Sequence, residues 1–134
     1  MRSAATLHSP EAERAVLAAV LLKPELLEDL PLSPADFYLE RHQALFGTFQ
    51  ELLAEHRPID LRTVQASLEL HGQLGHVGGL AYLAELDLDL PDIGRIDTYA
   101  EIVRERAVRR RLEQAGRRMQ EQAGNGELTA GGIA

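Results

Sequence analysis

The chain has 134 residues, a formal net charge of −7 and no cysteine. Its length suits one domain with a sizeable core, and 45% hydrophobic against 26% charged residues is typical of a folded globular chain. The missing cysteines exclude disulfides and thiolate metal sites, which agrees with a cytoplasmic location. The longest apolar run, 15–22, is too short to cross a bilayer, so we expect no contact with membranes.

The charge is distributed unevenly along the chain. Residues 95–121 contain eight arginines and five acids, a net charge of +3, so the rest of the chain carries −10. An acidic surface repels the phosphate backbone of nucleic acids. Only the carboxy-terminal stretch can therefore attract DNA.

The first predicted helix covers 10–22. Ser9 can cap its free amides, Pro10 suits the first helical position, and Lys23-Pro24 ends the helix. Its apolar residues at helical spacing are Ala12, Val16, Ala19, Val20 and Leu22.

Two short helices are predicted next, at 24–30 and after Ser33-Pro34, where the pattern of a capping residue followed by proline is repeated. A core helix is predicted over 40–56, with apolar residues at three- and four-residue steps. These residues are Leu45, Phe46, Phe49, Leu52 and Leu53.

Asp60 can cap a further helix that buries Leu61, Val64 and Leu68 and stops at Gly72. Glycines at 75, 78 and 79 predict a turn, and 80–86 predicts another short helix before Pro91.

The last predicted helix runs from Ile96 to about Ala123. At about 1.5 Å per residue it spans roughly 40 Å, so part of it should project from a small globule. We expect the tail 124–134 to turn, to begin another helix at Thr129 and to be cut short. The apolar residues predicted along one side of the long helix are Ile96, Tyr99, Ala100, Val103, Ala107, Leu112, Ala115 and Met119.

Motifs for catalysis are missing from the sequence. A nucleotide-binding phosphate loop needs a lysine followed by serine or threonine, but the only lysine, Lys23, precedes Pro24. The five histidines show no helical ligand pair, so packing or surface roles are favoured over a metal. Asp87 and Asp89 are interpreted as a solvated loop. We therefore predict no catalytic, cofactor-binding or metal-binding residues, and no enzyme activity in this chain.

The arginines of the last helix allow three interpretations. Arg109, Arg110 and Arg111 spread over about 200° of a helix, so no single face collects all three, which argues against a stripe that binds nucleic acid. Arg104, Arg111 and Arg118 recur at seven-residue steps beside apolar positions, which favours a protein interface over a plain solvated face. The predicted interface residues are Arg104, Ala107, Val108, Arg111, Leu112 and Ala115.

Five segments in register resemble the amino-terminal domain of the DnaB family of bacterial replicative helicases. Together they cover about 8–123. They are Ser9–Glu13, Asp36-Phe37-Tyr38 with His42 and Phe46, Pro58–Leu61 with Val64, Val77–Leu86, and Tyr99–Ala107. The chain departs from the family pattern at 87–95, where a polar proline loop is usual.

The resemblance implies an all-α fold: a compact helical bundle, 8–94, followed by a second unit, 95–134, made of a long helix that forms the first arm of a helical hairpin and of a truncated tail. It implies a collar whose arms pair between subunits on a hexameric ring and bind primase. It also implies a separate motor domain, absent here, that uses ATP and Mg²⁺ to move on DNA. The alternative function is binding of single-stranded DNA by the arginine-rich last helix.

Overall fold

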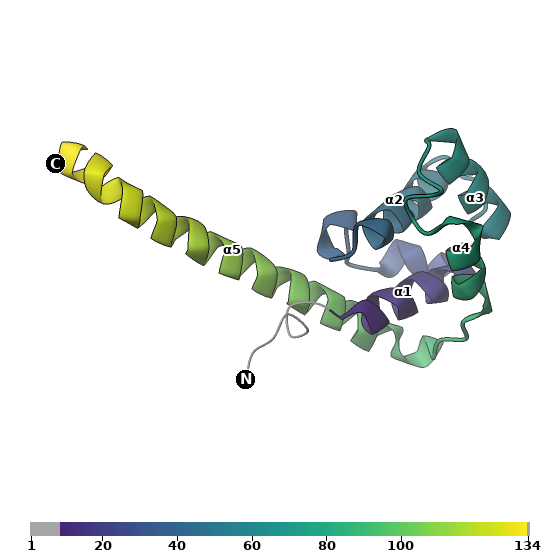
Figure 1. Ribbon diagram of the computed structural model, residues 1–134. Coiled ribbons are helices and arrows are strands. Elements are labelled where there is room, and N and C mark those ends of the chain that lie inside the picture. Colours follow the sequence, from purple (N-terminus) through teal and green to yellow (C-terminus); the bar gives the residue numbers. More distant parts are fainter. Residues whose placement is uncertain (1–8, 134) are drawn as a thin grey trace.

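The computed structural model describes residues 9–133, and describes side chains for 9–124. Within 9–133 the chain forms helices and no strand, so the predicted all-α fold is confirmed. Figure 1 shows a compact bundle from which the last helix projects as a long rod. In chain order the elements are α1 (Pro10–Leu22), η2 (Pro24–Asp29), η3 (Pro34–Asp36), α2 (Glu40–Ala54), α3 (Leu61–Leu70), α4 (Gly79–Leu88), η4 (Ile93–Arg95) and α5 (Ile96–Ile133).

The first helix is the central element of the bundle. The Ser9 hydroxyl accepts a hydrogen bond from the Ala12 amide at 3.3 Å, and Pro10 occupies the first turn, as predicted. α1 packs against α2, α4 and α5, so residues on most of its circumference are buried. Leu22, expected in the buried stripe, is 51% exposed because the helix ends there and the chain turns at Pro24.

Three buried phenylalanines fill the space between η3 and α2. They are Phe37, Phe46 and Phe49, and the rings of Phe37 and Phe46 lie 4.9 Å apart. Aromatic rings at this separation attract one another in addition to the area they bury. This contact holds the loop before α2 onto the core.

The predicted boundaries of α3 and α4 are largely correct. The Asp60 carboxylate accepts a hydrogen bond from the Thr63 amide at 2.9 Å, which caps α3. Gly72 has a φ of +67°, the left-handed conformation that ends a helix. Gly78 has a φ of +104°, and a Cβ there would lie 2.8 Å from the Cβ of Tyr82, so the turn before α4 requires glycine.

A buried polar network joins α1, α2 and α4. The Glu13 carboxylate, 1% exposed, accepts hydrogen bonds from the amides of Tyr38 at 2.6 Å and Leu39 at 3.4 Å. His42 Nδ1 donates to Glu13 Oε1 at 2.8 Å, and in the neutral imidazole Nε2 accepts from the Tyr82 hydroxyl at 2.6 Å. Burial raises the pKa of Tyr82, so its hydroxyl remains a donor. His42 is 1% exposed, so for this histidine the expected packing role is confirmed.

The predicted end of the last helix is wrong. The expected turn at Gly124 and the separate helix at Thr129 are both part of α5, which continues to Ile133. Glycine inside a helix costs about 1 kcal/mol relative to alanine, and the chain has no proline after Pro91 to break the hydrogen bonding. The outer ends of the two predicted units, His8 and Ala134, lie outside the described residues.

Replacing Glu13 with alanine leaves the His42 imidazole and two backbone amides without their acceptor in the core. We expect the free energy of unfolding to fall by about 3 kcal/mol, measured by urea denaturation followed by circular dichroism. The control Glu11→Ala removes a carboxylate from the exposed side of the same helical turn. It should cost less than about 1 kcal/mol; equal losses would show that the network does not stabilise the bundle.

Candidate protein-interaction surface

The last helix has a buried part and a projecting part. Ile96, Ala100, Val103 and Ala107 are buried, and this part of α5 packs against α1 and η3. Beyond Ala107 no described side chain of α5 is buried, and the helix runs away from the bundle toward the carboxyl end in Figure 1. An isolated helix of this kind lacks the tertiary packing that provides most helical stability.

The projecting part carries apolar side chains that the described residues leave uncovered. Val108 is 43% exposed, and Leu112 and Met119 are each 67% exposed. With the half-buried Ala115 they follow four-, three- and four-residue steps, the spacing of a helix-to-helix seam. We call these four residues the exposed apolar stripe.

The prediction that all apolar residues of this helix share one side is wrong. Leu112 lies five residues after Ala107, which rotates it about 140° around the helix axis. The buried residues therefore face α1 while the exposed apolar stripe faces away from it. The helix has one seam inside the chain and a second seam turned outward.

The six predicted interface residues have different environments. Arg104, Val108 and Leu112 are exposed, and Ala115 is half-buried. Ala107 is 1% exposed and packs inside the bundle, so its side chain offers no area to a partner. Arg111 is exposed but forms an ion pair with Asp36 of the same chain.

Asp36 connects the arm to the bundle. Its Oδ1 lies 2.6 Å from Arg111 Nη2, and its backbone carbonyl accepts a hydrogen bond from Arg110 Nη2 at 2.8 Å. Its other carboxylate oxygen accepts from the Ser33 amide at 2.8 Å, which holds the acid in place. The guanidinium of Arg110 also lies over the Tyr38 ring at 5.3 Å, and burial lowers its pKa from the ordinary value.

Sequence patterns did not reveal this anchor. Asp36 stands 75 residues before Arg111 in the chain, and the Ser33-Pro34 signal beside it predicted only the start of a short helix. The arginine run therefore does not act as a single stripe: Arg109 pairs with Glu105 at 2.7 Å, one helical turn earlier. Two of the three consecutive arginines hold α5 against the bundle.

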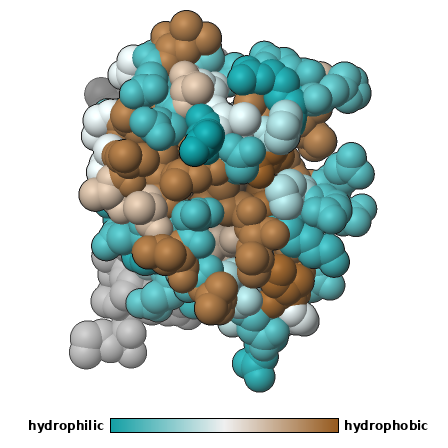
Figure 2. Space-filling view, turned by 90° about the vertical axis from the view of Figure 1, so that its right-hand side faces the viewer, coloured by the Kyte–Doolittle hydropathy of each residue, from teal (hydrophilic) through white to brown (hydrophobic). Residues whose placement is uncertain are grey.

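A second exposed apolar area lies on the bundle itself. Figure 2 shows brown, hydrophobic side chains gathered between teal ones on the face that includes α4. α4 is apolar around most of its circumference: Leu83 and Leu86 are buried, whereas Leu80 and Leu88 are 47% and 79% exposed. A helix that is apolar all round is normally covered on all sides.

The described residues offer no grouping of three or more histidine, aspartate or glutamate side chains that could hold a metal ion. Over the same part of the chain, every helix is too short or too polar to span a membrane. The two exposed apolar areas are the surfaces from which an interaction site can be built.

These features define a class: an all-helical domain with a bundle as its head and its last helix as a projecting arm. A family model described as the DnaB-like helicase N terminal domain matches residues 5–105. The chain belongs to this family.

Curated relatives are replicative DNA helicases named DnaB. The chain is 39% identical over 116 residues to that of Haemophilus influenzae, covering 85% of this chain and 25% of the relative. It is 42% identical over 106 residues to that of Geobacillus stearothermophilus, covering 78% and 23%. The chain thus spans about a quarter of the length of these relatives.

Two solved structures share the fold. The N-terminal domain of DnaB helicase from Mycobacterium tuberculosis matches with a TM-score of 0.82 and 35% identity, covering 87% of this chain and 86% of that one. A DnaB-like replicative helicase, described together with its interactions with primase, matches with a TM-score of 0.74 and 26% identity over 84% of this chain and 27% of that one.

The anchor at Asp36 can be measured with a double-mutant cycle. We expect Asp36→Asn and Arg111→Gln, alone and combined, to give a coupling free energy of about 1 kcal/mol in urea denaturation, because the Asp36 side chain is mostly buried. The control pair, Glu113 and Arg117, lies 3.0 Å apart on the exposed arm. The coupling free energy of this control pair should stay below about 0.5 kcal/mol. If the coupling between Asp36 and Arg111 is no larger than that of the control pair, their ion pair does not anchor the arm.

Proposed function

We propose that this domain is the collar module of a replicative helicase, and that its arm pairs with a second copy and docks primase. The carrying observation is the exposed apolar stripe of Val108, Leu112, Ala115 and Met119 on a helix that extends away from its own bundle. Exposed apolar surface of this kind marks interaction sites. The relative described with primase supports this choice of partner.

The charge of the arm supports pairing between helices. Arg104 and Arg118 are exposed and flank the stripe, where charged residues beside an apolar seam set partner choice and orientation. Of the predicted interface residues, Arg104, Val108, Leu112 and Ala115 carry the proposal. Arg111 contributes by fixing the arm to Asp36.

The rest of the helicase completes the proposed activity. The curated relatives are replicative helicases about four times as long, so a separate motor domain would accompany this one. That domain would bind ATP and Mg²⁺ and move on DNA in the cytoplasm as part of a hexameric ring. This domain would supply assembly and docking, and no catalytic residue.

Leu112→Glu places a charge in the middle of the exposed apolar stripe. In the complete helicase that carries this domain, we expect at least a tenfold weaker affinity for primase, measured by isothermal titration calorimetry, and a loss of ring assembly, measured by sedimentation velocity. The control Gln120→Glu adds the same charge to an exposed position on another side of α5. If both variants assemble and bind like the parent, the stripe is not the interface.

Binding of single-stranded DNA is the competing function, and the contacts of the arginines argue against it. Arg110 and Arg111 bind Asp36, Arg109 binds Glu105, and the net charge is −7. We expect no change in fluorescence anisotropy when the 134-residue chain is mixed with a labelled oligonucleotide at low salt. A signal that falls steeply with added salt would establish phosphate binding instead.

A further inference from the structure

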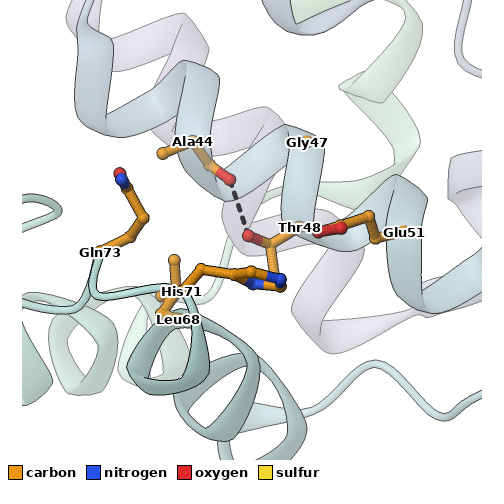
Figure 3. Close-up of a pocket in the computed structure, with 7 residues that line it drawn as sticks. All are labelled: Ala44, Gly47, Thr48, Glu51, Leu68, His71 and Gln73. Carbon is orange, nitrogen blue, oxygen red and sulfur yellow. Dashed lines mark hydrogen bonds between the residues drawn. The ribbon is translucent and has the colours of Figure 1, made fainter.

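A pocket between α2 and the end of α3 is separate from the arm and from the buried network. Its volume is about 290 Å³, and its walls come from α2 and from three residues at and after the end of α3, Leu68, His71 and Gln73. Figure 3 shows Thr48 and Glu51 on one side and His71 opposite, with Leu68 below. The lining residues are Ala44, Gly47, Thr48, Glu51, Leu68, His71 and Gln73.

Three polar side chains of this pocket, Thr48, Glu51 and His71, can present hydrogen-bond acceptors, whereas the amide of Gln73 offers both a donor and an acceptor. Thr48 donates its hydroxyl hydrogen to the Ala44 carbonyl at 2.8 Å (Figure 3). Toward a ligand, Oγ1 can therefore act only as an acceptor. His71 Nδ1 lies 2.9 Å from the Ser67 carbonyl, which can only accept. Nδ1 therefore carries the hydrogen, and Nε2 of the neutral ring is an acceptor.

Glu51 adds a negative charge to these acceptors. Among the described residues, its carboxylate takes part in no hydrogen bond or ion pair, although the neighbouring acid Glu55 is paired with Arg57. The surrounding bundle, 9–94, contains fifteen acidic and five basic residues. Glu51 and the net charge of the bundle, 5 − 15 = −10, therefore favour a cation over an anion.

The floor and the size of the pocket suit an aliphatic stem. The half-buried Ala44 supplies apolar surface against which the methylene groups of a long basic side chain can pack, and Leu68, 1% exposed, lies beneath as the floor. A volume of about 290 Å³ is at the lower end for ligand pockets, which fits one side chain better than a cofactor. Gly47 lies in the middle of α2 and lines the pocket. A Cβ at this position would make only an ordinary contact with Pro34, 3.8 Å away, so packing within the chain does not require a glycine there.

We propose that this pocket binds an arginine side chain presented by a partner protein. The guanidinium carries five donors in a planar fork, which matches acceptors that converge from two elements better than the single ammonium of lysine does. Glu51 would supply the charged acceptor, with Thr48 Oγ1 and His71 Nε2 beside it. The proposal involves no residue of α5, so its test is independent of the test of the collar function.

The probe is N-acetyl-L-arginine amide, titrated into the ¹⁵N-labelled chain and followed by two-dimensional NMR. We expect shift changes centred on 44–51 and 68–73, and a response at least tenfold smaller to the neutral isostere N-acetyl-L-citrulline amide. Glu51→Gln should reduce the arginine response about tenfold. Because Glu51 is exposed, this variant should keep the spectrum of the folded chain.

The matched control is Glu69→Gln, which removes the same charge from an exposed position of α3 outside the pocket. It should leave the arginine response within twofold of the parent. An equal response to citrulline, an unchanged response in Glu51→Gln, or shifts spread over the acidic surface would each overturn the proposal.

Discussion

The carboxylate of Glu13 is the point at which the helices of the bundle are joined. A carboxylate taken out of water is costly unless it is paired and fully hydrogen-bonded. Here the donors are His42 and the amides of Tyr38 and Leu39, and the chain of contacts continues through His42 to Tyr82. These partners come from α2, α4 and the loop before α2, so α1 can take only one position among them.

The position of α1 in turn decides the direction of the arm. The first turns of α5 pack against α1, and Arg110 and Arg111 bind Asp36 at the edge of the bundle. Because α5 is one continuous helix, its orientation at the bundle extends along the whole arm. The exposed apolar stripe is therefore presented at a set angle, which reduces the ordering cost of forming an interface.

Charge and apolar surface divide the molecule into two working parts. The bundle carries most of the acids and holds the pocket between α2 and α3, whereas the arm carries most of the arginines and the apolar seam. The two surfaces share no residue, so one domain can pair through its arm while its bundle remains free for a different contact. The exposed leucines on α4 leave a further apolar area on the bundle (Figure 2).

Sequence patterns alone predicted the starts of α1 and α3, because caps such as Ser9 and Asp60 act over three residues. They also predicted the all-helical class and the family. They did not reveal that Glu13 is buried or that Asp36 binds Arg111, since both depend on partners at least 25 residues away. They also misplaced the end of α5 and merged two apolar faces into one. Tertiary packing decides which side of that helix is covered. The apolar pattern of a sequence shows which positions share a face, but it does not show which element packs against that face.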